Sequence, residues 1–376
     1  MLFRSRYDER DRGACGLMGW ISRKGRRQNG EAILEAIANM HERGNGLGGG
    51  FAAYGIYPDW ADYYCFHVMY GDERAKDQTE ELLGQRFEVA HFEEIPTRPH
   101  PAIKNEPLLW RYFLSPKDVA EEATEDDHAV AAVMDVNAEI DGAFVFSSGK
   151  NMGAFKAVGY PEEVGQFFMV EHYEAYIWTA HARFPTNTQA WWGGAHPFCL
   201  LDYSVVHNGE ISSYGINRRY LEMYGYRCTL QTDTEVMVYL FDLLVRRHRL
   251  PFEVACDAVA APFWKNIDAD EDEDRRRLRT MLRQVYASAM VNGPFAIVLG
   301  FGNGMLGLCD RIKLRPMVAA EDGDELYISS EEAAIHVMCP EPERVWMPKA
   351  GQPVVGYLDE GVAPGGAARV AADREE

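Results

Sequence analysis

Apolar and polar positions along the chain predict interleaved strands and helices. Residues 15–21 are a short apolar segment with strand character, and residues 31–40 place their apolar side chains on one helical face. A glycine-rich loop follows at residues 44–50. Further along, residues 175–182 and 198–206 each read as a strand.

The second half of the chain continues this alternation. Thr232-Asp-Thr-Glu has the spacing of a capping box, which predicts an apolar helix from there to about Arg247. A charged helix is predicted over residues 269–290, where acids precede arginines by four positions. Three short strands are expected at residues 295–300, 305–308 and 325–329. We interpret residues 15–360 as one α+β domain with a polar insertion at about 57–166, and residues 361–376 as a weakly ordered tail.

Composition narrows the class of protein. The chain has 376 residues, of which 47 % are hydrophobic and 26 % charged, an ordinary globular mixture. Its 58 acidic and 38 basic residues give a net charge of −20, which argues against a nucleic-acid partner and against docking on an anionic membrane. No apolar run approaches the ~18 residues that span a bilayer. The seven cysteines are scattered and form no C-x-x-C pair, so we expect no disulfide framework or metal centre and a cytoplasmic location.

The glycine-rich loop matches G-x-G-x-x-G over residues 44–49. The dinucleotide fingerprint needs a strand before the loop and a helix after it, whereas here a helix precedes and a strand follows. We therefore interpret the loop as a turn with several positive φ angles that lines a pocket.

Cys15 has two interpretations. A cysteine at a strand start is ordinarily a buried structural residue, but Cys15 lies between small residues directly after a short polar leader, residues 1–14. Cleavage before Cys15 would give it a free α-amino group, whose pKa of about 8 suits proton transfer near neutral pH. Nucleophile and base would then belong to one residue.

Three other polar positions also allow a structural or a functional role. Arg183 lies at the end of a predicted strand, where its guanidinium could bind a ligand carboxylate through two hydrogen bonds or form a structural ion pair. Asn208-Gly209 is typical of a type I′ hairpin, but its amide groups also suit an oxyanion hole. Asp233 either complements a helix dipole or binds a substrate ammonium group. His181 and His196 lack a third ligand at sensible spacing, so we treat them as structural.

Taken in order, the motifs resemble those of class II glutamine amidotransferases. They are Cys15-Gly-x-x-Gly, Arg43-Gly-x-Gly-x-Gly, His181-x-Arg-Phe-x-Thr-Asn-Thr, Pro197-Phe, His207-Asn-Gly-Glu-Ile and Thr232-Asp-Thr-Glu. The stretch RFPTNTQAWWGGAHPF followed by VVHNGEIS is most similar to the glutaminase domain of glutamate synthase. The resemblance implies a four-layer αββα sandwich of the N-terminal-nucleophile hydrolase type.

The resemblance also implies roles. Cys15 would attack the side-chain amide of L-glutamine, Asn208 and Gly209 would stabilise the oxyanion, Arg183 would hold the α-carboxylate and Asp233 the α-ammonium. Three residues on matching motif positions would shape the pocket: Phe184, Thr186 and Asn187. Activity would require removal of residues 1–14. Residues 193–196 depart from the bulkier segment that is usual in large glutamate synthases.

The same resemblance predicts a stand-alone glutaminase subunit that passes ammonia to other chains. No cluster-binding cysteine run is present, so flavin and an iron–sulfur cluster are expected on partner subunits and no cofactor on this chain. The flavin-containing partner would be of the glutamate-synthase or N-methylglutamate-synthase type, with further subunits. One alternative is a non-catalytic assembly subunit that never frees Cys15. Another is an amide hydrolase with other substrates and no partner, against which the Arg183 and Asp233 pair counts.

Overall fold

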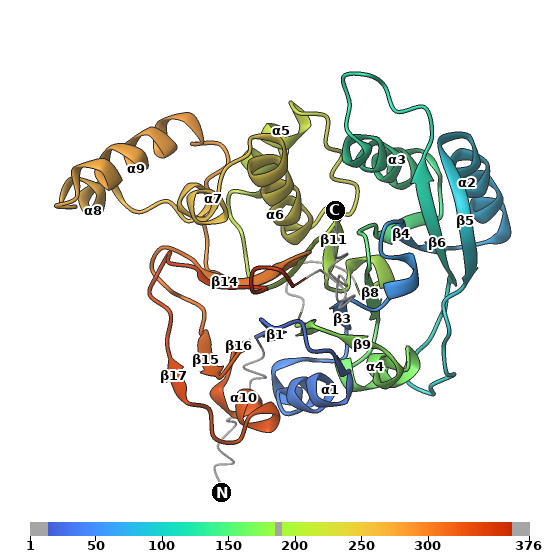
Figure 1. Cartoon of the computed structure of the whole chain (residues 1–376), viewed down its shortest axis with the longest axis horizontal. Helices are drawn as coiled ribbons and strands as arrows, with labels where there is room; N and C mark the ends of the chain where they lie inside the picture. Colours follow the sequence, from blue (N-terminus) through green and yellow to red (C-terminus); the bar gives the residue numbers. More distant parts are fainter. Residues whose placement is uncertain (1–13, 185–189, 363–376) are drawn as a thin grey trace, which may run out of the picture.

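The computed structural model describes residues 14–184 and 190–362, and two packed β-sheets form its centre (Figure 1). The first has seven strands, in the order β17-β15-β16-β1-β10-β3-β8, and the second has five, in the order β11-β12-β13-β14-β18. Neighbouring strands in both are antiparallel. The strand bounds are β1 Gly16–Ser22, β3 Gly49–Tyr54, β8 Met152–Ala157, β10 Ile177–Ala182, β15 Val318–Asp322, β16 Glu325–Ser329 and β17 Arg344–Trp346, then β11 Phe198–Leu200, β12 Tyr203–Gly209, β13 Phe295–Phe301, β14 Gly304–Cys309 and β18 Val354–Tyr357.

Apolar side chains hold the two sheets together. Every residue of β1 and of β13 is buried, and a hydrophobic cluster that includes Ile21, Val298 and Met305 fills the space between the sheets. Burial on both faces explains why these strands read as continuous apolar runs in the sequence.

Helices cover the outer faces of both sheets. On the seven-stranded sheet lie α1 (Glu31–Ala38), α4 (Pro161–Phe167) and α10 (Glu332–Met338). On the five-stranded sheet lies α6 (Asp233–Phe241), flanked by α5 (Tyr214–Glu222) and α7 (Phe252–Val259), with α8 (Trp264–Asp268) and α9 (Glu273–Val285) beyond α7 (Figure 1). Helix, sheet, sheet and helix are thus stacked in turn, which confirms the expected four-layer α+β sandwich.

Residues 64–147 contribute a third sheet to one side of the sandwich. The last part of the predicted insertion, up to residue 166, instead supplies β8 and most of α4 to the main sandwich. The third sheet has the order β5-β6-β4-β7. The bounds of these elements are β4 Tyr64–Tyr70, β5 Phe87–Glu94, β6 Leu108–Pro116, β7 Ala143–Ser147, α2 Glu73–Arg86 and α3 Glu125–Glu139. The acidic stretch at 121–127 leads into α3, where a capping box between Thr124 and Asp127 begins the helix. Two further strands of two residues each, β2 (Gln28–Asn29) and β9 (Glu174–Ala175), pair with each other.

Several predicted elements have different bounds from those expected. The charged helix predicted over residues 269–290 is confined to α9, and the strand predicted over residues 175–182 is divided at Tyr176 between β9 and β10. Residues 198–206 form two strands instead of one, because the chain turns at Leu201, whose φ is +49°. The predicted helix from Thr232 changes at Asp242–Arg247 into a π-helix. Within the described ranges, no helix has both the length and the apolar character needed to cross a bilayer. The proposed leader, apart from Ala14, and most of the proposed tail lie outside these ranges.

We predict that Gly19→Ala destabilises the sandwich. A Cβ on Gly19 in β1 would lie 2.7 Å from Cγ1 of Val298 and from Sδ of Met305, both in the opposite sheet. Overpacking of this kind costs about 1–3 kcal/mol, which urea denaturation would measure. The matched control is Gly84→Ala in α2, where no atom lies within 4 Å of the new Cβ. It should leave stability unchanged or raise it by up to about 1 kcal/mol. Equal effects of the two substitutions would contradict this account of the interface.

Candidate active site

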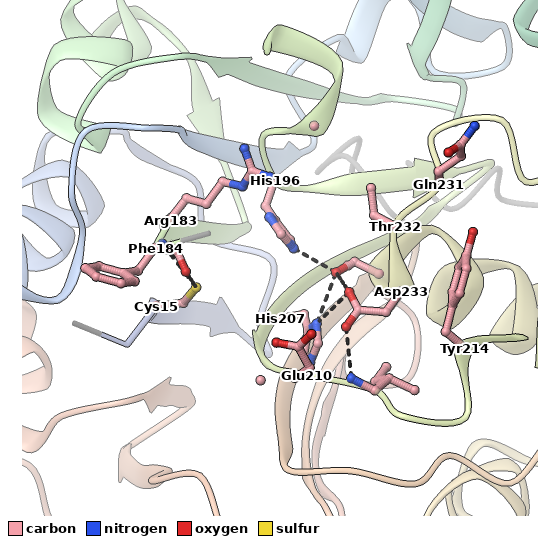
Figure 2. A pocket seen from close by; sticks show the side chains of 14 residues that line it. Cys15, Arg183, Phe184, His196, His207, Glu210, Tyr214, Gln231, Thr232 and Asp233 are labelled. Carbon is pink, nitrogen blue, oxygen red and sulfur yellow. Dashed lines mark hydrogen bonds and ion pairs between the residues drawn. The ribbon is translucent and has the colours of Figure 1, made fainter. Parts of the chain in front are cut away.

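A cavity of about 300 Å³ gathers most of the residues that the sequence singled out (Figure 2). Cys15 directly precedes β1, Arg183 and Phe184 follow β10, Gly209 ends β12, and Asp233 is the first residue of α6. The rest of the lining comes from Gly194, His196, His207, Glu210, Ile211, Tyr214, Gln231, Thr232 and Thr234. Chemistry-bearing residues from both sheets and one helix therefore share one concave site.

The Cys15 thiol is held by the backbone that follows β10. The Sγ atom accepts a hydrogen bond from the Phe184 N–H at 3.3 Å. The backbone carbonyl oxygen of Cys15 accepts a second hydrogen bond, from Nε of Arg43 at 3.2 Å. Burial raises the pKa of the thiol, an effect that the Phe184 N–H and the charge of Arg183 oppose. The site thus already supplies two groups that favour a thiolate over a thiol.

The glycine-rich loop holds Arg183 in place. The Arg183 N–H donates to the Gly48 carbonyl at 2.9 Å, and Nη1 donates to the Leu47 carbonyl at 3.1 Å. Gly46 and Gly48 have positive φ angles, as the interpretation of the loop as a turn predicted. A Cβ on Gly48 would lie 2.7 Å from Cδ of Arg183, so the arginine stem lies where only glycine leaves room. Burial lowers the pKa of the guanidinium, but its ordinary value is so high that the group stays charged.

The hairpin interpretation of Asn208-Gly209 is wrong. Both residues belong to β12 and pair with β13, Asn208 opposite Ala296 and Gly209 opposite Phe295. The long-range ladder overrides the local turn preference, and a Cβ on Gly209 would lie 2.0 Å from the Pro294 carbonyl oxygen. Asn208 is buried, and its Nδ2 has no hydrogen-bond partner among the described residues. A buried amide donor is costly unless a partner satisfies it. Asn208 is not among the residues that line the cavity, whereas its neighbours His207 and Gly209 are, so its oxyanion role stays a prediction.

Asp233 combines its two predicted roles in one position. It begins α6, whose N-cap Thr232 accepts a hydrogen bond from the Glu235 N–H at 3.3 Å. Its carboxylate lines the cavity, accepts from the Ile211 N–H at 3.0 Å and lies 3.5 Å from Nδ1 of His207. Burial alone raises the pKa of Asp233, but His207 and the hydrogen bonds to the carboxylate outweigh burial and lower it. The cavity therefore has an anion in one wall and the Arg183 cation in another.

The sequence analysis missed a polar network behind Asp233. The Thr234 hydroxyl lies 2.8 Å from Nε2 of His196 and 3.1 Å from Nδ1 of His207. It also lies 3.3 Å from Asp233 Oδ1. Figure 2 shows the side chains of His196, His207 and Asp233 pointing toward one another in the cavity. The adjacency of His207 to Asn208 was the one local signal that could have suggested part of this cluster.

His181 and His196 behave as neutral imidazoles. Their rings stack with centroids 4.0 Å apart, and Nε2 of His181 contacts the His207 carbonyl oxygen at 3.0 Å. Burial lowers the pKa of His181 to about 3 and that of His196 well below its usual value. Among the residues that the structure describes, no group of His, Cys, Asp and Glu is arranged to hold a metal ion. Two more predicted pocket residues, Thr186 and Asn187, lie outside the described ranges.

These depressed pKa values predict acid sensitivity. Below about pH 6.5 the unfolded chain binds protons at both imidazoles and the folded chain does not. The free energy of unfolding should therefore fall as the pH falls from about 6.5 toward the folded pKa values, by up to about 1.4 kcal/mol per pH unit for each histidine. Urea denaturation between about pH 7 and about pH 5 should give a shallower slope for His196→Gln than for the wild type. The control is His172→Gln, whose side chain is 63 % exposed. Parallel slopes for all three proteins would count against buried neutral imidazoles.

Comparison with known proteins relates part of this site to a known family. Residues 71–236 match the family described as glutamine amidotransferases class-II. That range includes Arg183, Asn208, Gly209 and Asp233 and begins after Cys15. An uncharacterized protein of Archaeoglobus fulgidus is 52 % identical over 93 % of this chain and 94 % of its own length.

More distant relatives have functional names. A putative glutamine amidotransferase of Methanothermobacter thermautotrophicus is 23 % identical over 85 % of this chain and 92 % of its own. A glutamine–fructose-6-phosphate aminotransferase of Sulfurisphaera tokodaii is 35 % identical, over 28 % of this chain and 18 % of its own. Among solved structures, the chain aligns with the glutamine phosphoribosylpyrophosphate amidotransferase of B. subtilis with a TM-score of 0.43 and 13 % identity, over 92 % of this chain and 50 % of that one. Residues 71–236 therefore carry a class II glutamine amidotransferase domain.

Proposed function

We propose that this protein hydrolyses L-glutamine to L-glutamate and ammonia through a thioester on Cys15. The observation that carries the proposal is the shared cavity, which a thiol, a guanidinium and a carboxylate all line. A zwitterionic amino acid with a side-chain amide matches this set, since it presents a carboxylate, an ammonium and a carbonyl carbon for attack. The separation of Arg183 and Asp233 on different walls supports recognition of both charged groups at once.

The reaction proceeds in two halves. The Cys15 sulfur forms a bond to the amide carbon of glutamine, and its proton passes through the α-amino group of Cys15 to the departing ammonia. Water then attacks the γ-glutamyl thioester, returns the thiol and releases glutamate. Asn208 Nδ2 and the Gly209 N–H would stabilise the oxyanion in both halves. The proposal requires cleavage between Ala14 and Cys15, because an amide nitrogen is not basic enough to act as the base.

The ammonia would pass to a separate partner. We infer a cytoplasmic flavin-containing synthase subunit of the glutamate-synthase or N-methylglutamate-synthase type, together with further subunits. These partner subunits would carry the flavin and an iron–sulfur cluster between them. The support for this partner is the similarity of RFPTNTQAWWGGAHPF and VVHNGEIS to the glutaminase domain of glutamate synthase. Mass spectrometry of chains that co-purify from the native cell tests it, and co-purification of a flavin-free acceptor enzyme alone would overturn it.

Replacement of the nucleophile should abolish hydrolysis. Cys15→Ala should lower kcat/KM for glutamine by about 10³-fold or more, because no other group can form the thioester. Ammonia release from glutamine is the measurement. Cys228→Ala serves as the matched control, since Cys228 packs against the core and does not line the cavity. Intact mass of the wild type from its native cell should show loss of residues 1–14. Retention of Met1 there would favour the non-catalytic assembly subunit instead.

The two charged residues should affect substrate binding in a matched way. Arg183→Lys keeps the charge but loses the bidentate fork, and Asp233→Asn removes the anion, so each should raise KM for glutamine by about 10-fold to 100-fold. Steady-state kinetics with Arg98→Lys as the control would show this, because Arg98 is a surface residue paired with Glu171. An unchanged KM in both site variants, or faster turnover of an unrelated amide, would support the general amide hydrolase.

A further inference from the structure

Lys156 is a buried cation next to the site. It lies in β8, is 1 % exposed, and pairs with Gly50 of β3. Its Nζ donates to the carbonyl oxygens of Gly193 at 3.0 Å and Pro197 at 3.2 Å. The same atom lies 4.5 Å from the centre of the Phe198 ring. The ammonium is thus surrounded by neutral acceptors and an aromatic face.

No carboxylate among the described residues forms an ion pair with Lys156. Burial lowers its pKa to about 8, so the group is mostly charged near neutral pH. Lysine is almost never fully buried without a charged partner, because removal of an ammonium from water is costly. An apolar side chain of similar length would fill this position without that cost. The lysine therefore calls for a role beyond packing.

The two carbonyls that Lys156 binds are the ends of one segment of the cavity wall. Residues 193–197 begin in the short 3₁₀ turn Trp192–Gly194 and run into β11. Two residues between those ends, Gly194 and His196, line the cavity. The segment lies directly on the sheet, because a Cβ on Gly50 would be 2.3 Å from the His196 carbonyl oxygen.

The inner side of this segment faces Arg183. A Cβ on Gly194 would lie 3.6 Å from Nη2 of Arg183. After burial, the pKa of Lys156 is raised by Cys199 and Glu235 and lowered by the positive charge of Arg183. An anion bound at Arg183 would relieve that repulsion between the two cations. Binding of a carboxylate there and protonation of Lys156 consequently favour each other.

We propose that Lys156 is a positioning residue for the α-carboxylate of the substrate. Its ammonium ties residues 193 and 197 to β8, which fixes the wall beside Arg183 and adds a second positive charge behind the carboxylate position. This inference rests on the proposed glutaminase function. It assigns a specific electrostatic support to residues 193–197, of which residues 193–196 depart from the large glutamate synthases.

The test compares two substrates in the processed wild type and in Lys156→Met. Glutamine has the α-carboxylate, and 4-aminobutanamide is the same molecule without it. Lys156→Met should lower kcat/KM for glutamine by about 10-fold or more, through KM, and leave 4-aminobutanamide within about 2-fold. The control is Lys150→Met, a half-buried lysine over the Tyr64 ring away from this cavity. Equal losses on both substrates would reduce Lys156 to a structural role and overturn the inference, as would an unchanged KM.

The pH dependence supplies a second readout. The KM of the wild type for glutamine should rise as the pH passes about 8, where Lys156 loses its proton. Lys156→Arg keeps its charge and should not show that additional rise, and it also decides the case if Lys156→Met fails to fold. The same rise in Lys156→Arg as in the wild type would overturn the inference. Failure of the processed wild type to hydrolyse glutamine at all would instead overturn the proposed function.

Discussion

The antiparallel pairing of β1 with β10 is the constraint on which the site depends. Gly16 lies opposite Ala182, so the start of β1 and the end of β10 lie side by side. The residue before β1 and the residues after β10 therefore meet at the same end of the two strands. That register brings Cys15 to the Phe184 N–H and places Arg183 beside it, although they are far apart in sequence. A shift by one residue would turn the side chains of β1 to the opposite faces. The thiol and the guanidinium would then no longer share a cavity.

The packing of the two sheets adds the other wall. β12 belongs to the second sheet, and α6 lies on that sheet's outer face, so Gly209 and Asp233 reach the cavity from across the interface. The hydrogen bond from the Ile211 N–H to the Asp233 carboxylate links the chain after β12 to the start of α6. Small residues permit this close approach, as the backbone contact around Gly209 shows. The cavity is therefore a product of sheet-on-sheet packing, and the segments that join strands and helices supply much of its lining.

Electrostatics around the cavity follow from burial. Imidazoles at His181 and His196 are kept neutral, while Arg183 remains charged and Asp233 is stabilised as an anion by its hydrogen bonds. A low-dielectric surrounding strengthens the attraction of these two charges for a zwitterion. The fold also holds buried donors such as Asn208 Nδ2 in place before any ligand binds. Preorganisation of this kind lowers the cost of stabilising a developing oxyanion.

The sequence by itself determined the elements that have strong local signals, and the order of its motifs identified the candidate site residues. The helix at residues 31–38 follows from apolar periodicity, the start of α6 from Thr232, and the turn around Gly46 and Gly48 from glycine, because each depends on neighbours a few positions away. Motif order also selected Cys15, Arg183, Gly209 and Asp233. The tertiary structure alone decided that Asn208-Gly209 continues a strand, since pairing with β13 outweighs the local turn preference. It alone revealed the contacts of Thr234 with His196 and of Lys156 with the 193–197 segment, because no local pattern encodes contacts between residues 37 to 41 positions apart.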